Sequence, residues 1–178
     1  MAELLTVGHG TATRQGLTSL LRGAEVGAVV DIRRFPGSRR DPDLASEELA
    51  RWLPEGGIGY RWEPRLGGRR RLAAGTSSPD TWWRVEAFRA YAAYMRSEEF
   101  GEAMADLLVG LAGTRTAVMC SETLWWRCHR RLVSDAAELL HGVPVKHLMH
   151  DGALAPHRPS EGARVTAEGL VYDGRGTR

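Results

Sequence analysis

The chain has 178 residues, 43% of them hydrophobic, and a formal net charge of +2, which suits one domain with its own core and argues against a second full domain. Its only cysteines are Cys120 and Cys128, so it is not a disulfide-rich scaffold. No apolar run approaches the roughly 20 residues of a membrane-spanning helix, and residues 1–3 lack the pattern of a signal peptide, so we expect a cytoplasmic protein with no membrane contact.

The first third of the chain has the pattern of alternating strands and helices. Residues 4–7 form a short apolar run, and Leu17, Leu20 and Leu21 then recur at helical spacing. Residues 28–32 read as a second buried strand that ends in a loop containing Pro and Gly. This pattern predicts an α/β fold with a mostly parallel sheet flanked by helices on both faces.

The middle of the chain predicts a short helix, an edge strand and two helices. Leu49, Trp52 and Leu53 indicate the short helix, and residues 58–62 alternate like an edge strand. A basic loop starts at 66–68, and we expect residues 69–80 to be mobile. Residues 81–110 indicate two consecutive amphipathic helices, with Ser97 as the N-cap of the second.

The last third predicts a strand at 116–119, a helix over residues 132–140 and a fourth strand at 143–149. Residues after 152 are rich in Gly, Pro and charge and predict at most one short strand near 170–172. We therefore expect a single α/β domain over residues 1–152 and a C-terminal extension over 153–178.

Chemically selective side chains follow the predicted strands. Ligands of open parallel sheets bind beyond the carboxyl ends of the strands, where loops and helix N-termini converge. A pocket is therefore expected there, built from the residues that close the four strands in turn, namely His9, then Asp31 and Arg33, then Cys120 and Glu122, then His150 and Asp151.

Cys128, His129 and Arg130 stand where the helix after the third long strand should begin. Free backbone N–H groups and the positive end of the helix dipole stabilise a thiolate or bind an anion at such a place. Cys128 is therefore a candidate nucleophile. The alternative is structural, with Cys128 packed into the sheet and Arg130 on a surface.

Metal binding is a rival interpretation, because the chain offers soft and borderline ligands for zinc or iron. No CxxC or HxxxH pair occurs, so only the fold could assemble such a site, and the sequence leaves both metal and cofactor open. We expect His141 and His157 to be exposed to solvent. The candidate ligands are Cys120, Cys128, His129 and His150.

Four separated motifs occur in an order that resembles the family called domain of unknown function 488. The resemblance covers about the first 150 residues, and it departs at Gly10, where the family usually has a serine. It implies an α/β fold in a small, mainly bacterial, cytoplasmic protein, with the motif residues in one pocket, and it implies no established reaction. The motifs are Thr6-Val-Gly-His9, Asp31-Ile-Arg33-x-Phe35-Pro36-x-Ser38, Tyr60…Leu66-Gly67-Gly68 and Cys120-x-Glu122-x5-Cys128-His129-Arg130.

Our leading hypothesis is an enzyme, a thiol-dependent transferase or hydrolase, acting on a phosphorylated or nucleic-acid-derived substrate. Cys120 or Cys128 would supply the thiolate, and Glu122, His9 or His129 would move protons. Arg33 and Arg130 would hold the anion. The resemblance adds further substrate-binding candidates, which are Asp31, Ser38, Tyr60, Gly67 and Gly68.

The second hypothesis is a binding module without turnover. The basic side chains are almost all arginines, whose planar fork suits phosphate, although a GC-rich genome would give the same bias and is our preferred explanation of the overall excess. Such a module would bind nucleic acid or a nucleotide through Arg39, Arg40 and Arg69 to Arg71, with Tyr60, Trp62, Trp82 or Trp83 for stacking. A metal or thiol sensor is a third possibility.

Overall fold

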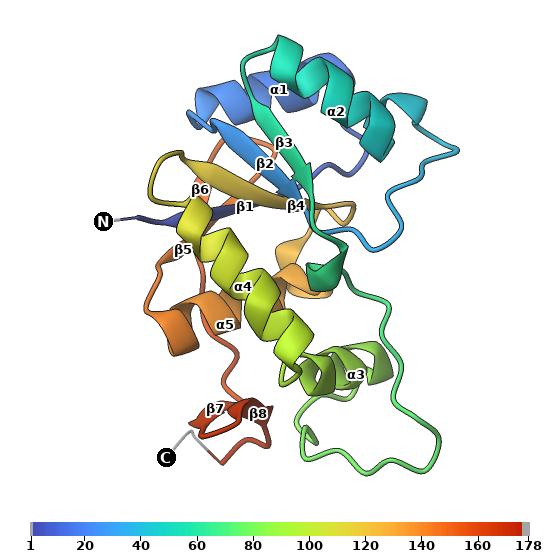
Figure 1. Cartoon of the computed structure of the whole chain (residues 1–178), viewed down its shortest axis with the longest axis vertical. Coiled ribbons are helices and arrows are strands. Elements are labelled where there is room, and N and C mark those ends of the chain that lie inside the picture. Colours follow the sequence, from blue (N-terminus) through green and yellow to red (C-terminus); the bar gives the residue numbers. More distant parts are fainter. Residues whose placement is uncertain (1, 176–178) are drawn as a thin grey trace.

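The computed structural model describes residues 2–175 and confirms a single α/β domain with a mostly parallel sheet (Figure 1). Its six-stranded sheet has the order β3-β2-β4-β1-β5-β6, and only β6 runs antiparallel to its neighbour. The predicted edge strand at 58–62 is confirmed, because β3 stands at one end of this order. The strands are β1 (Leu4–Gly8), β2 (Ala28–Asp31), β3 (Gly59–Trp62), β4 (Thr116–Cys120), β5 (Val145–Leu148) and β6 (Leu154–Pro156).

Hydroxyl side chains cap the N-termini of two of the helices. Thr13 Oγ1 accepts the backbone N–H of Gly16 at 3.0 Å, and Ser97 Oγ accepts that of Phe100 at 3.3 Å. Ser97 thereby separates α3 from α4, which confirms the predicted pair of consecutive helices. The helices are α1 (Arg14–Gly23), α2 (Ser46–Glu55), α3 (Glu86–Tyr94), α4 (Glu98–Gly110) and α5 (Arg130–His141), and the 3-10 turns are η1 (Pro42–Leu44), η2 (Pro64–Leu66) and η3 (Trp125–Arg127).

The side chains of the central strands divide between two hydrophobic cores. Leu5 and Val7 of β1 belong to a core that draws on α1 and α2, whereas Leu4 belongs to one that draws on α3, α4 and α5. This division follows from strand geometry, because successive side chains point to opposite faces of a sheet. Cys120 and Cys128 both belong to the second core.

The connections of β1 and β4 leave the sheet in opposite directions. The chain passes from β1 through α1 to β2, on one side, and from β4 through α5 to β5, on the other. β1 and β4 are neighbours, so the order of the sheet reverses between them. Ligands of open α/β sheets bind at this kind of reversal, beyond the carboxyl ends of the strands. Gly8 and Cys120 are the last residues of these two strands.

The segment after residue 152 contains more structure than its sequence predicts. The expectation of at most one strand is wrong, because β6 extends the main sheet, and β7 (Ala163–Thr166) and β8 (Gly169–Tyr172) form a hairpin. β6 has three residues and β7 is only partly buried, so neither has a clear apolar pattern. Within the described residues, no helix is long and apolar enough to cross a membrane.

Candidate functional site

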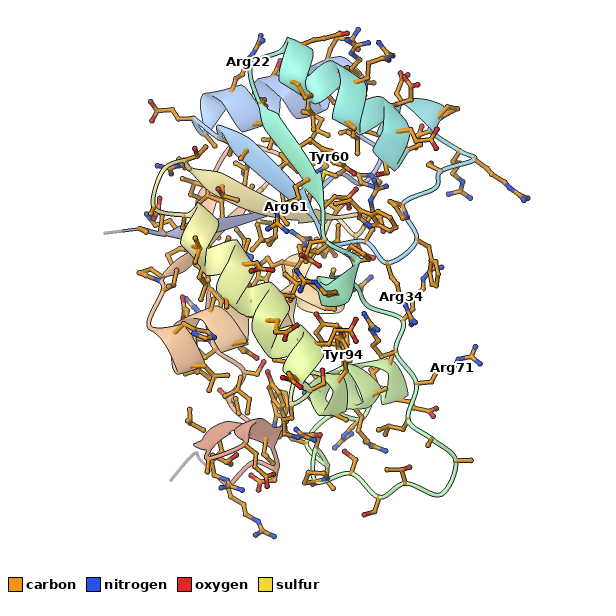
Figure 2. All side chains as sticks on the ribbon, viewed as in Figure 1. Arg22, Arg34, Tyr60, Arg61, Arg71 and Tyr94 are labelled. Atoms are coloured by element: carbon orange, nitrogen blue, oxygen red, sulfur yellow. The ribbon has the colours of Figure 1, made fainter. Side chains whose placement is uncertain are left out.

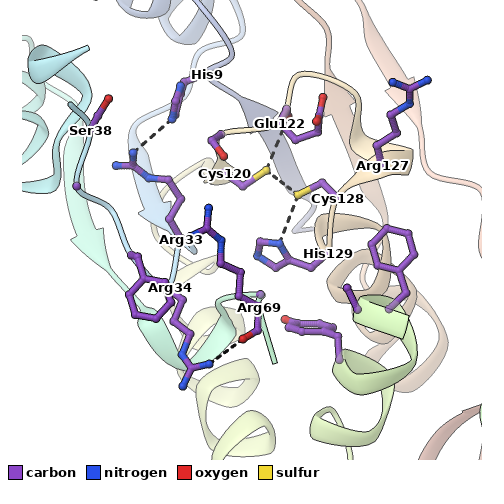
Figure 3. A pocket seen from close by; sticks show the side chains of 17 residues that line it. His9, Arg33, Arg34, Ser38, Arg69, Cys120, Glu122, Arg127, Cys128 and His129 are labelled. Carbon is purple, nitrogen blue, oxygen red and sulfur yellow. Dashed lines mark hydrogen bonds between the residues drawn. The ribbon is translucent and has the colours of Figure 1, made fainter. Parts of the chain in front are cut away.

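A cavity of about 340 Å³ opens at the carboxyl ends of β1, β2 and β4 (Figure 3). Its volume lies within the usual range of ligand pockets. Eight of the predicted site residues line it, and the complete lining is His9, Arg33, Arg34, Phe35, Gly37, Ser38, Gly68, Arg69, Ala87, Phe88, Tyr91, Cys120, Ser121, Glu122, Arg127, Cys128 and His129.

The two thiols meet on one wall of this cavity. Cys120 ends β4 and Cys128 precedes α5, and their sulfur atoms lie 2.7 Å apart. The Cys128 sulfur also lies 3.4 Å from Nδ1 of His129 and accepts the backbone N–H of Arg130 at 3.5 Å. Cys128 therefore sits at the N-terminus of α5, where the helix dipole favours a negative charge.

The two thiols differ in acidity. Burial raises the pKa of the Cys120 thiol well above its ordinary value, and the neighbouring Cys128 raises it further. Burial also opposes ionisation of Cys128, but the hydrogen bond from Cys120 and the charges of His129 and Arg130 outweigh it, so the pKa of Cys128 falls well below its ordinary value. These opposite shifts favour an arrangement in which Cys128 is the thiolate and Cys120 donates its S–H to it.

The ring of His129 is fixed by two contacts. Its Nε2 lies 3.0 Å from the carbonyl oxygen of Ile32, which can only accept, so Nε2 carries a proton and Nδ1 is left to exchange one with Cys128. Gly68 packs against the ring, and a Cβ there would stand 3.0 Å from Nδ1. A thiol, an imidazole that can exchange a proton with it and a carbonyl that orients the ring are therefore aligned.

On the opposite wall of the cavity, Arg33 donates a hydrogen bond to the ring of His9. Arg33 binds both carboxylate oxygens of the buried Asp31 and donates from Nη1 to Nε2 of His9 at 3.3 Å. Nδ1 of His9 donates to the Gly10 carbonyl at 2.9 Å. Burial lowers the pKa of His9, although its bond to Gly10 opposes the shift, and Arg33 lowers it further. His9 is therefore held neutral, and most of the Arg33 guanidinium is already occupied.

Asp31, Tyr60 and Gly67, which the sequence placed among the substrate-binding residues, lie outside the pocket lining. Tyr60 donates its hydroxyl to Asp31 at 2.6 Å, and burial followed by the Asp31 charge raises the pKa of Tyr60. A Cβ at Gly67 would approach the backbone of Arg34 to 2.7 Å. These residues therefore support the pocket from behind.

Arg130 also differs from its expected role as an anion ligand. Its side chain is 1% exposed and does not line the cavity. Nη2 donates to the carbonyl oxygens of Glu122 and Thr123, and Nη1 donates to Thr6 Oγ1 at 3.2 Å. Arg130 thus anchors the loop between the two cysteines to β1.

A buried chain of hydrogen bonds leads away from Arg130. Because Thr6 Oγ1 accepts from Arg130, its proton goes to Nδ1 of His147 (2.7 Å). Nε2 of His147 then donates to Nδ1 of His157 (2.9 Å), and Nε2 of His157 donates to Asp135 (2.7 Å). The expectation that His157 is exposed is wrong, since only 6% of it is accessible. Two imidazoles thus connect a buried cation with a buried carboxylate.

We expect His147 to make the protein less stable in acid. Burial, and then the neighbouring His157 and Arg130, lowers the pKa of His147 from 6.5 to about 3. The unfolded chain therefore binds a proton that the folded chain excludes, so the contribution to stability is complete above pH 6.5 and falls as the pH decreases towards 3. Urea unfolding across this interval should show a steeper loss for the wild type than for His147→Asn, which does not titrate; equal slopes would contradict the assignment.

The candidate metal ligands are not assembled into a metal site. Nε2 of His150 lies 2.6 Å from the Gly8 carbonyl oxygen, and His150 does not line the cavity. Among residues 2–175 there is no group of three or more His, Cys, Asp or Glu side chains that could hold a metal ion. The thiols instead partner each other and His129.

Sequence reasoning missed part of the lining. Arg34 lies three residues after the end of β2, so the position of this strand end could have identified it, whereas Phe35 stands in a motif of the family resemblance. Arg69 was predicted only as a nucleic-acid-binding residue; its φ of 59° is uncommon for a residue with a side chain, and Arg34 donates to its carbonyl oxygen at 2.9 Å. Phe88 and Tyr91 come from α3, whose aromatic residues resemble an ordinary core stripe, so nothing in the sequence marked them.

A model of the DUF488 family, whose description is a domain of unknown function, matches residues 13–137. The chain belongs to the DUF488 family. This confirms the resemblance inferred from the motifs. Within the DUF488 match lie both cysteines, His129 and Asp135, whereas His9, His147 and His157 lie outside it. Searches of curated proteins and of solved structures found no match.

Proposed function

We propose that this DUF488 protein is an enzyme in which Cys128 attacks an anionic substrate that is phosphorylated or derived from nucleic acid. The observation that carries the proposal is the position of the Cys128 sulfur, on the wall of the cavity, at the N-terminus of α5 and beside His129. Both effects stabilise a thiolate, the reactive form of cysteine. A reduced thiolate suits the cytoplasm, the compartment we propose.

The charges around the cavity favour an anion. Arg34, Arg69 and Arg127 line it together with Arg33, whereas Glu122 is the one carboxylate in the lining. Guanidinium groups bind phosphate oxygens through paired N–H donors, which gives orientation as well as attraction. Three arginines contributed by separate loops could hold a phosphate beside the Cys128 sulfur.

The proposed chemistry is a transfer to sulfur followed by release. The Cys128 sulfur forms a bond to the electrophilic atom of the substrate, and the leaving group departs with the electron pair of the broken bond. His129 can supply the proton that the leaving group requires, because its Nδ1 faces the Cys128 sulfur. Release to water makes the protein a hydrolase, and release to another acceptor makes it a transferase.

The first test measures the alkylation rate of reduced protein against pH. Cys128 should react with iodoacetamide with an apparent pKa well below about 8.5, the unperturbed value, and Cys120 should stay unreactive. The rapid reaction with iodoacetamide should vanish in Cys128→Ser. It should persist in Cys120→Ser, but with a raised apparent pKa for Cys128, because Cys128 has lost the S–H donor of Cys120. An ordinary pKa for Cys128 in the folded wild type would contradict the proposal.

The second candidate function is nucleic-acid binding without turnover, favoured by exposed arginines next to the cavity. Arg39 and Arg40 follow Ser38, and Arg71 points outward from the loop after β3 (Figure 2). Of the expected stacking residues, Trp62 is 45% exposed, whereas Trp82 and Trp83 pack against each other and Arg131. Such binding should weaken steeply as salt rises and survive Cys128→Ser.

A further inference from the structure

The only two cysteines of the chain lie in the same cavity wall, although eight positions separate them. Figure 3 shows their sulfur atoms facing each other between the end of β4 and the start of α5. Each thiol is buried, with 2% of Cys120 and 6% of Cys128 accessible. A role for Cys120 other than packing is suggested by this direct contact.

The separation of the two sulfur atoms is short enough for a bond between them. They lie 2.7 Å apart, and a disulfide requires about 2.05 Å, so an approach of less than about 1 Å would join them. The loop between the cysteines is held at its ends by the sheet and by α5, and Arg130 binds its Glu122 carbonyl. The fold therefore brings together a pair that the sequence spacing alone would not define.

The environment of the pair distinguishes an attacking from a resolving cysteine. Cys128 has His129 Nδ1 and the Arg130 N–H as additional partners, which favour its thiolate. Cys120 is the more deeply buried of the two thiols, with 2% accessible against 6%, and burial favours its protonated form. An oxidant that enters the cavity would thus meet one nucleophilic sulfur with a thiol directly behind it.

We propose that Cys120 and Cys128 form a reversible disulfide in response to hydroperoxides, with Cys128 as the peroxide-reactive sulfur and Cys120 as the resolving cysteine. This disulfide proposal rests on the Cys128 thiolate of the proposed function and describes how the same site would be regulated. Joining the sulfurs removes the nucleophile from the cavity, and a dithiol reductant restores it.

Both steps balance. The Cys128 thiolate attacks the terminal oxygen of the hydroperoxide, an S–O bond forms, and the O–O bond breaks with its electron pair on the departing alkoxide, which is protonated to the alcohol. Sulfur is thereby oxidised by two electrons to a sulfenic acid. Cys120 then loses its proton and attacks the Cys128 sulfur, so the S–S bond forms and the hydroxyl group leaves as water.

The test treats reduced protein with one equivalent of hydrogen peroxide and then cleaves it with trypsin under non-reducing conditions. Cleavage after Arg127 separates the cysteines, so the disulfide appears as the peptide 116–127 linked to 128–130. We expect this linked peptide, loss of both thiols that can be alkylated in denaturant, and full recovery with dithiothreitol. In Cys120→Ser the reaction should stop at a sulfenic acid on Cys128, which dimedone captures, and in Cys128→Ser the remaining thiol should survive the same dose.

Two results would overturn the inference, and both leave the proposed function standing. One is a Cys128 that reacts rapidly with iodoacetamide yet gives sulfenic or sulfinic acid without the linked peptide in the wild type. The other is a disulfide between two molecules, seen as a dimer on a non-reducing gel. Conversely, if Cys128 has an ordinary pKa and the linked peptide still forms, the proposed thiolate enzyme would be refuted, whereas the proposed peroxide-dependent disulfide would stand.

Discussion

Replacing Asp31 by alanine should cost about 3–5 kcal/mol of unfolding free energy, the usual loss when one partner of a buried ion pair is removed. Asp31 is fully buried and binds the Arg33 guanidinium through both oxygens, at 2.9 and 2.7 Å. Tyr60 donates to the same carboxylate at 2.6 Å. The variant therefore leaves a buried cation without its carboxylate and removes one of the two acceptors near the Tyr60 hydroxyl, the other being Ser46 Oγ.

Urea unfolding with two comparison variants tests this expectation. Glu48→Ala removes an exposed ion pair with Arg51 and should cost less than about 1 kcal/mol. The double variant Asp31→Ala/Arg33→Met should be no less stable than Asp31→Ala, because the cation that lost its partner is also gone. Similar small losses for Asp31→Ala and Glu48→Ala would show that water solvates Arg33 and that the wall of the cavity is open.

Replacing Gly8 by alanine should destabilise the protein by more than about 4 kcal/mol, a loss that marks severe structural conflict. An added Cβ would stand 1.8 Å from the carbonyl oxygen of Glu122 and 2.7 Å from Nη2 of Arg130. The first of these is backbone, so it cannot turn away as a flexible side chain could. The end of β1 and the cysteine loop would have to separate.

Gly101→Ala is the matched control for this substitution. Gly101 lies in α4, and a Cβ there meets nothing within 4 Å. Alanine should therefore stabilise that helix by about 0.5–1 kcal/mol, because it restricts the unfolded backbone. If Gly8→Ala unfolds in urea within 1 kcal/mol of the wild type, the cysteine loop is free to move and Arg130 does not fix it.

The sequence predicted the fold best where the pattern of apolar residues was local. The alternation of strands and helices identified β1, β2 and β4 with their helices, and the strand ends then pointed to His9, Cys120 and Glu122. The motif residues of the family resemblance added Ser38 and Gly68, which line the cavity. These inferences needed only the period of side chains along an element and the rule for ligands of parallel sheets.

The sequence could not separate the residues that line the cavity from those that support it. Arg130 and Asp31 belong to the same motifs as Cys128 and Arg33, but their side chains turn into the protein, and only three-dimensional packing reveals this. The contact of Thr6 with His147 joins positions 141 residues apart, which no local pattern encodes. The predicted strand near 170–172 is β8, but β6 and β7 were missed because short, partly exposed strands have little apolar signal.

The hydrogen-bonded chain from Arg130 to Asp135 affects the order in which segments of the protein can fold during synthesis on the ribosome. Asp135 receives its partners from His157 and Tyr172, and both emerge well after the cysteine loop. A buried carboxylate without these donors is costly, so α5 should not settle on the sheet until they arrive. The nascent chain therefore carries both thiols for some time before it can form the surroundings that lower the pKa of the Cys128 thiol.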